Sequence, residues 1–253
     1  NLIHKIMNPL LDEIVNSIKT TVLDNSVGVA FSGGVDSTLI AKLLHDNGYD
    51  IHLLTIGFPD SHDINFAKEV NEILKFKHDI LEIDLDSFQK VSEQVNDIIK
   101  TDNLSWNENS IAFYYVSKLA KKLGISTVVT ANGIDELFCG YNAYREAIGI
   151  GVDEVMNVMN QKLDNEKKMM IAVNNVTSLF DVKILQPLLH EDFISYAKTI
   201  PISEKITDSN DLQRKHAIRK LAASCGVPEI SAYKQKKALQ YGSKIHKQLL
   251  KLR

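Results

Sequence analysis

The spacing of apolar residues divides the chain into two unequal parts. In the first part, short apolar runs alternate with segments of helical periodicity. We expect strands at 27–31, 51–56, 79–83 and 126–131, and helices at 10–18, 39–44, 64–74 and 112–123. This alternation predicts an α/β fold, in which a parallel β-sheet of about five strands is covered by helices on both faces.

After about residue 141 the strand signals largely vanish, and helices are expected at 152–160, 166–172, 191–199 and 212–224. We therefore interpret residues 1–140 as an α/β core and residues 141–253 as a helical region. No linker separates the two, so we expect one continuous domain. Ligands of parallel sheets bind at the carboxyl ends of the strands, and we expect the site there, completed by the helical region.

Composition and charge narrow the class of protein. A formal net charge of −3 over 253 residues gives no global reason to bind nucleic acid, and we expect no such partner. Cys139 and Cys225 form no paired motif, which argues against a zinc ribbon or a disulfide framework and suits a reducing cytoplasm. We expect residues 1–19 to form an amphipathic helix rather than a signal peptide, and no apolar run reaches eighteen residues. We expect a cytoplasmic protein without a membrane partner.

The segment Ser32-Gly33-Gly34-Val35-Asp36-Ser37 lies between the first expected strand and its helix. Its glycines let the backbone approach an anion, and amides entering a helix favour negative charge. Ser32 and Ser37 add hydroxyl donors, and Asp36 offers a hard oxygen to Mg²⁺. The structural alternative is a glycine turn with a serine N-cap.

This segment lacks the lysine of a Walker loop, which holds a nucleotide for transfer of its terminal phosphoryl group. It resembles instead the pyrophosphate loop of the N-type ATP pyrophosphatases. That resemblance implies an adenine nucleotide alpha hydrolase-like fold and ATP as the bound nucleotide. It also implies that the loop holds the β- and γ-phosphates as a leaving pyrophosphate while AMP passes to a substrate.

A second motif indicates one branch of these pyrophosphatases. Residues 130–141, Thr-Ala-Asn-Gly-Ile-Asp-Glu-Leu-Phe-Cys-Gly-Tyr, follow the fourth expected strand. They resemble the Ser-Gly-Glu-Gly-x-Asp-Glu-Leu/Ile-Phe-Gly-Gly-Tyr signature of asparagine synthetases and β-lactam synthetases. Asp135 would face Asp36 at the strand ends, where two carboxylates suit magnesium. The structural alternative for Asp135 and Glu136 is the acidic first turn of a helix.

Further segments resemble the same family in order. Residues 54–58 resemble its second-strand end, where a backbone group meets adenine, and residues 187–189 its Pro-Phe-Leu-Asp segment. Residues 215–219 resemble its Lys-x-x-Leu-Arg, and residues 233–237 its Trp-Arg-x-Lys-Gln/Glu stretch, in which Lys236 matches the catalytic lysine. The resemblance implies catalytic roles for Lys236, Asp135 and Asp36, a metal role for Asp36 and Asp135, and an adenosine pocket lined by Ala30, Ile56, Thr130 and Ala131.

The resemblance runs from the first helix to about Ser243 and covers the synthetase half of an asparagine synthetase, not its glutaminase domain. It implies a stand-alone ligase that uses ATP and Mg²⁺ to adenylate a small-molecule carboxylate and passes it to ammonia or an amine. A separate glutaminase would be one ammonia-supplying partner. The residues nearer the acceptor depart from the family. Asn132 replaces a glutamate tied to chemistry after ATP binding, Cys139 a glycine, His190 an aspartate, and Lys183 and Leu185 a glutamate and an arginine.

Two alternatives stay open. One is a pyrophosphatase of another acceptor class, such as a tRNA- or sulfur-transfer enzyme. The other is a partner subunit that binds ATP without catalysis, which the asparagine at position 132 makes conceivable.

Overall fold

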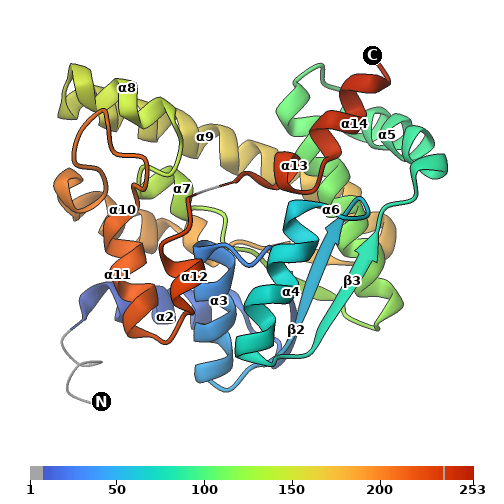
Figure 1. Cartoon of the computed structure of the whole chain (residues 1–253), viewed down its shortest axis with the longest axis horizontal. Helices are drawn as coiled ribbons and strands as arrows, with labels where there is room; N and C mark the ends of the chain where they lie inside the picture. Colours follow the sequence, from blue (N-terminus) through green and yellow to red (C-terminus); the bar gives the residue numbers. More distant parts are fainter. Residues whose placement is uncertain (1–7, 236) are drawn as a thin grey trace.

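Five parallel strands form one sheet at the centre of the protein (Figure 1). The computed structural model describes residues 8–235 and 237–253. The sheet has the order β3-β2-β1-β4-β5 and consists of β1 (Ser26–Ala30), β2 (Asp50–Gly57), β3 (His78–Glu82), β4 (Thr127–Val129) and β5 (Lys183–Leu185). The expected α/β fold with about five parallel strands is confirmed.

The order of the strands reverses next to β1. The chain builds β1, β2 and β3 outward in one direction and then returns to place β4 and β5 on the other side of β1. Val29 of β1 therefore lies between Leu53 of β2 and Val129 of β4. At such a switch point the loops that follow the two central strands leave in opposite directions, which opens a crevice at their carboxyl ends.

Each face of the sheet is covered by its own set of helices. Successive side chains of a strand point to opposite faces, so Val29 and Leu53 belong to one core while Leu54 and Val128 belong to the other. The first core packs against α2 (Pro9–Thr21), α3 (Val35–Asp46), α4 (His62–Leu74), α10 (Glu191–Thr199) and α11 (His216–Ser224). The second packs against α5 (Leu85–Ile99), α6 (Leu104–Lys122) and the C-terminal half of α9 (Val152–Thr177), while the N-terminal half of α9 contributes to the first core.

Short helices complete the second half of the chain. They are α7 (Ile134–Leu137), α8 (Ala143–Ile150), α12 (Glu229–Ala232), α13 (Leu239–Gly242) and α14 (Ile245–Lys251), with 3₁₀ turns at Ser178–Phe180, Pro187–Leu189 and Ile202–Glu204. Both α13 and α14 contact α6 on the β2 side of the molecule (Figure 1). The first core contains residues from both regions separated at residue 140; the boundary itself stays a prediction.

Several sequence-based expectations about elements were wrong. β5 lies in the region expected to be helical. Its sequence, Lys-Ile-Leu, lacks the continuous β-branched run that marks β4. The expected helices at 152–160 and 166–172 are one helix of 26 residues, α9, whose polar middle keeps Leu163 as a buried apolar position. Helix α5 was not assigned, and α6 begins at Leu104, eight residues before the expected start.

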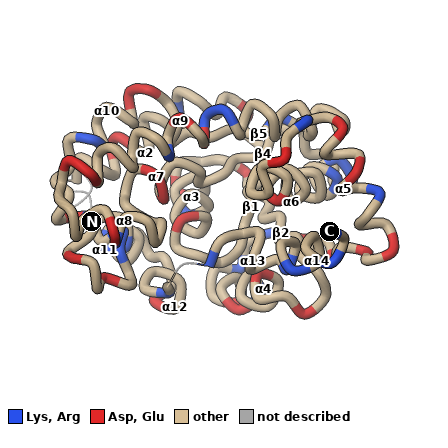
Figure 2. The backbone as a smooth tube through the Cα atoms, turned by 90° about the horizontal axis from the view of Figure 1, so that it is seen from above, with Lys and Arg blue, Asp and Glu red and all other residues tan. Residues whose placement is uncertain are grey.

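Acidic and basic residues are interspersed over the outer helices in the view of Figure 2. Within residues 8–235 and 237–253, no helix combines the length and the apolar composition needed to cross a bilayer.

Candidate active site

A cavity of about 290 Å³ lies at the carboxyl ends of β1, β2 and β4. The predicted site residues that line it are Ala30, Ser32, Gly34, Val35, Asp36, Ser37, Ile56, Thr130, Ala131 and Asp135. Gly33 does not line the cavity but lies in the same loop, and Lys236 falls outside the described residues. The fold thus brings together side chains that are up to about a hundred residues apart in the chain, as the switch-point argument expects.

The glycine-rich loop has one position that requires glycine. Gly33 has a φ of +83°, and a Cβ there would lie 3.0 Å from both the ring and the backbone carbonyl oxygen of Phe66. The loop is also bonded internally: the Ser32 amide donates to Ser37 Oγ at 3.3 Å, and the Gly34 amide donates to Ser32 Oγ at 3.4 Å. A larger residue at position 33 would therefore displace the loop from its position against α4.

Helix α3 begins within this loop, at Val35. Its N-cap is Gly34, which has no side chain to cap the first turn. Amides at a helix N-terminus carry partial positive charge and point outward along the axis. This charge favours an anion in the cavity, as binding of a phosphate group would require.

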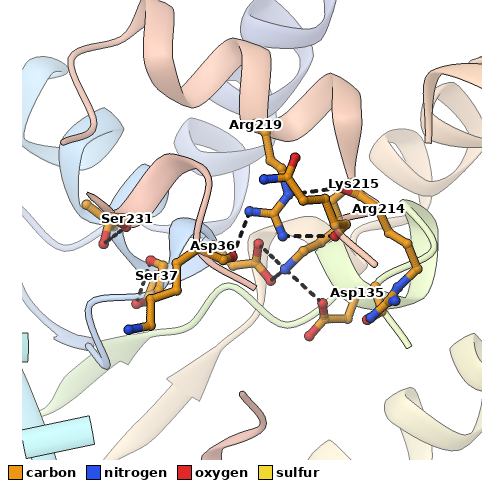
Figure 3. A network of polar contacts seen from close by, with 12 residues as sticks. Asp36, Ser37, Asp135, Arg214, Lys215, Arg219 and Ser231 are labelled. Atoms are coloured by element: carbon orange, nitrogen blue, oxygen red, sulfur yellow. Dashed lines mark hydrogen bonds and ion pairs between the residues drawn. The ribbon is translucent and has the colours of Figure 1, made fainter. Parts of the chain in front are cut away.

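Ser231 of α12 is hydrogen-bonded to the glycine-rich loop. Its hydroxyl donates to the carbonyl oxygen of Gly33 at 2.6 Å and lies 3.2 Å from Thr38 Oγ1 (Figure 3). All of Ser231 is buried. The sequence offered no signal for this contact, because the partners are 198 residues apart.

Lys215 lies between the two predicted metal-binding carboxylates (Figure 3). Its ammonium nitrogen is 3.0 Å from Asp36 Oδ1 and 3.2 Å from Asp135 Oδ1, and its side chain is 3% exposed. Burial by itself lowers the pKa of Lys215, but the charges of Asp135 and Asp36 outweigh burial and raise the pKa above its ordinary value. Lys215 therefore stays charged and holds the two aspartates together.

The backbone that presents Lys215 is unusual. Arg214 and Lys215 both adopt the left-handed conformation, with φ values of +57° and +52°. Such residues need support from their surroundings, and Arg219 provides it. The residue is 1% exposed, and its guanidinium donates to the carbonyl oxygens of Gln213, Arg214, Ala232 and Lys234 at 2.8 to 3.0 Å (Figure 3). Arg219 thus fixes the segment that carries Lys215.

The second motif folds tightly around Asp135. A Cβ at Gly140 would lie 2.0 Å from Asp135 Oδ1, so glycine is required there. Arg214 Nη2 donates to the Gly140 carbonyl at 3.2 Å. Glu136 accepts the Gly133 amide at 2.8 Å and also accepts the hydroxyl of Tyr141. The helix-turn role weighed for Glu136 therefore exists in the structure.

Cys139, which replaces a family glycine, is fully buried at a φ of +61°. Burial raises the pKa of its thiol to about 12. The thiol is therefore protonated at neutral pH and acts as a small packed residue rather than a nucleophile.

Magnesium would suit the oxygens of Asp36 and Asp135. Both carboxylates converge on one cation, the Lys215 ammonium, so they are disposed around a common centre of positive charge. Hard carboxylate oxygens are the donors that Mg²⁺ prefers, and triphosphate oxygens supply the others. Among the described residues, His, Cys, Asp and Glu form no group of three that could hold a metal. The metal role of the two aspartates stays a prediction.

Residues of α6, α9 and the loop after β4 form another part of the cavity wall. Asn132 Nδ2 donates to Glu166 Oε1 at 2.5 Å, and Lys162 Nζ lies 4.8 Å over the ring of Tyr141. All four residues line the cavity, together with Asn165, Asn109 and Ser105. Trp106 lies in the first turn of α6 and donates from Nε1 to Asn165 Oδ1 at 2.9 Å. Sequence reasoning missed Glu166, Lys162 and Asn165.

The basic segment after α12 borders the cavity. Lys234 and Lys237 line it, and Lys234 Nζ lies 4.1 Å over the ring of Phe66. The predicted roles of Lys236 and of the other site residues stay predictions.

Comparison with known proteins gives a consistent family. The family model described as "Asparagine synthase" matches residues 9–172. A protein of Methanocaldococcus jannaschii, named provisionally as a glutamine-hydrolyzing asparagine synthetase, is 27% identical over 90% of this chain and 48% of its own length. The glutamine-hydrolyzing asparagine synthetase 1 of Arabidopsis thaliana is 26% identical over 80% of this chain and 36% of its own length. The chain thus spans about half, or less, of the length of these curated relatives.

Among solved structures, an NMN synthetase from Francisella tularensis aligns over 92% of this chain and 74% of its own, with a TM-score of 0.49 and 15% identity.

Proposed function

Because the chain belongs to the asparagine synthase family, we propose that it is an ATP-dependent ligase that adenylates a carboxylate and forms an amide, releasing AMP and pyrophosphate. The observation that carries the proposal is the cavity itself. The cavity is bordered by a loop without lysine, by the N-terminus of α3, and by two carboxylates that contact a buried ammonium.

In this proposal the loop from Ser32 to Ser37 cradles the β- and γ-phosphates through its amides and hydroxyls. Ala30, Ile56, Thr130 and Ala131 border the adenosine. Asp36 and Asp135 would hold magnesium, and the bound metal would neutralise negative charge on the phosphates.

The first step forms a bond between the substrate carboxylate oxygen and the α-phosphorus and breaks the bond from that phosphorus to the bridging oxygen. Pyrophosphate departs with the electron pair. Negative charge gathers on it, so cations fixed beside it act mainly in the transition state. Lys236 is assigned this role from the sequence. In the second step an amine or ammonia attacks the acyl carbon and AMP departs.

The nature of the acceptor, the ammonia source and a cytoplasmic location are parts of the proposal that rest on the family alone. An aspartate-like carboxylate with ammonia is the first pair to test.

Isotope exchange tests the reaction class. Label from pyrophosphate should enter ATP when Mg²⁺ and a panel of carboxylates, beginning with L-aspartate, are present. Under turnover the nucleotide product should be AMP. Formation of ADP and phosphate would contradict the proposal, as would ATP binding with no exchange for any carboxylate and no AMP.

A further inference from the structure

We propose that His62 and Lys234 form a second anion subsite beside the glycine-rich loop, and that His62 takes up a proton when the anion binds. The identity of the ligand rests on the function proposed above: it is the pyrophosphate group, either as the terminal phosphates of ATP or as the free product. His62 is the first residue of α4 and lines the same cavity as the loop. Lys234 lines the cavity from the segment after α12.

The ring of Phe66 places both side chains next to the glycine-rich loop. The His62 ring stacks on the Phe66 ring, with centroids 5.5 Å apart and an interplanar angle of 19°. Lys234 Nζ lies 4.1 Å from the centroid of the same ring. The ring itself packs against Gly33, since a Cβ there would lie 3.0 Å from it. The two basic side chains are therefore one aromatic ring away from the loop assigned to the β- and γ-phosphates.

Polar atoms at the start of α4 lack partners. The side chain of Ser61, the N-cap residue, makes no capping hydrogen bond. Its Oγ and the Oδ2 atom of Asp63 are buried, and neither has a hydrogen-bond partner among the described residues. Asp63 is 2% exposed and also lines the cavity. A helix N-terminus without a side-chain cap carries partial positive charge, which favours an anion at this wall of the cavity.

The charges around His62 also favour an anion. Burial and the charges of Lys234 and Lys237 lower the pKa of His62, so its imidazole is largely neutral at neutral pH in the free protein. Of the carboxyl groups next to it in the chain, Asp60 accepts a hydrogen bond from α4, and burial raises the pKa of Asp63 to about 8, which leaves Asp63 largely uncharged. Within residues 8–235 and 237–253, Lys234 forms no ion pair. A bound anion would meet the Lys234 ammonium and an imidazole that can gain a proton.

The departure of pyrophosphate gives this proton a role in the reaction. Breaking the bond to the α-phosphorus leaves additional negative charge on the pyrophosphate. A proton taken from solvent by the His62 imidazole adds one positive charge beside that group, and no covalent bond to the ligand forms. The proton returns to solvent when pyrophosphate leaves, because Lys234 and Lys237 again disfavour the imidazolium.

Proton uptake by His62 can be observed directly. Protein labelled with ¹⁵N at histidine gives imidazole resonances that report protonation, and those of His62 are assigned by their loss in His62→Gln. With saturating pyrophosphate or α,β-methylene-ATP, we expect the proton affinity of His62 to rise about tenfold or more. AMP, which lacks the terminal phosphates, should leave it unchanged. If both ligands bind and the titration of His62 does not move, the proposal is wrong.

The two ligands also distinguish the sources of the anion. A rise with pyrophosphate alone would identify the free product as the ligand, and a rise with the nucleotide alone would identify its terminal phosphates.

Variants separate binding from a structural role. Lys234→Met should raise the proton affinity of His62 in the free protein, because a neighbouring positive charge is removed, and should weaken pyrophosphate binding about tenfold in calorimetric titrations. His62→Gln should weaken binding about tenfold at about pH 6.5 and much less at about pH 8.5, where the imidazole is neutral. His45→Gln is the matched control, because the His45 ring also packs on a phenylalanine, Phe76, at 4.8 Å but does not line the cavity. Equal losses in His45→Gln and His62→Gln would contradict the subsite.

These outcomes are separable from the proposed reaction. If label from pyrophosphate enters ATP while the His62 resonances stay unmoved, the subsite is refuted and the reaction stands. If His62 responds to pyrophosphate in a saturable way but no carboxylate leads to AMP, the subsite is supported and the proposed reaction is refuted.

Discussion

Replacing Lys215 by methionine keeps most of the side-chain volume but removes the charge between Asp36 and Asp135. The ammonium lies 3.0 and 3.2 Å from the two carboxylates. At an effective dielectric constant of about 20, each contact corresponds to about 5 kcal/mol of attraction. Dehydration of the ions offsets much of this, and removal of one partner from a buried ion pair costs about 3–5 kcal/mol. We expect the free energy of unfolding to fall by that amount.

Urea denaturation in the presence of EDTA measures this loss. A divalent cation can take the place of the ammonium between the carboxylates, so roughly 10 mM MgCl₂ should restore about 1 kcal/mol or more to Lys215→Met. The native protein without nucleotide should gain less, because its ammonium already neutralises the pair. If Mg²⁺ does not raise the free energy of unfolding of Lys215→Met, Asp36 and Asp135 do not form a cation site.

Lys205→Met is the matched control. Lys205 is also fully buried, but its ammonium donates to the carbonyl oxygen of Ala197 at 2.7 Å and lies 5.3 Å over the ring of Phe138. Burial lowers its pKa to about 8. Its removal strands no buried carboxylate, so the change should stay within about 1 kcal/mol. Equal losses in both variants would mean that burial of any lysine, not the ion pairs, explains the effect.

Three further changes test other parts of the site. Lys236→Met should lower turnover by two to three orders of magnitude, about 3–4 kcal/mol, because a fixed cation acts on the departing pyrophosphate. Its ATP affinity should stay within about tenfold of the native value. Lys237→Met should change turnover little. Gly140→Ala should abolish adenylation measured by pyrophosphate exchange, because its Cβ would lie 2.0 Å from Asp135 Oδ1. Asp63→Asn should stabilise the protein increasingly above pH 5. Its pKa is raised from 3.8 to about 8 on folding. Between these values the unfolded protein ionises Asp63 and the folded protein does not, so the free energy of unfolding of the native protein falls by about 1.4 kcal/mol per pH unit as the pH rises.

Each of these has a contrary outcome. If Lys237→Met lowers turnover strongly and Lys236→Met does not, Lys237 is the residue that acts on the departing pyrophosphate. Equal, mild losses in both variants would mean that the two lysines form a solvated basic surface. Normal exchange in Gly140→Ala would show that the Asp135 carboxylate can move without loss of function. For Asp63, urea denaturation from pH 5 to 8 should show a growing difference from the native protein, while Asp97→Asn, at an exposed position of α5, should show none.

The local sequence determined the parts of the site that are continuous in the chain. Segment 32–37 and residues 130–141 each follow a strand, and each contains a turn that needs glycine and the start of a helix. These features are visible in the local sequence. The alternation of short apolar runs and helical periods likewise predicted the parallel sheet and the edge at which the cavity lies. These inferences needed no knowledge of which distant residues meet.

Only the tertiary structure decided which side chains complete the site. Lys215 meets Asp36 across 179 residues, Ser231 meets Gly33 across 198, and Glu166 meets Asn132 across 34. Lys215 lies in a segment that resembles the family's Lys-x-x-Leu-Arg, but nothing in the local sequence shows that it meets Asp36. Nothing in the local spacing marks Ser231 or Glu166 as buried. Their burial follows from how α9, α11 and α12 pack over the carboxyl edge of the sheet, where charged and polar groups persist because each finds a partner.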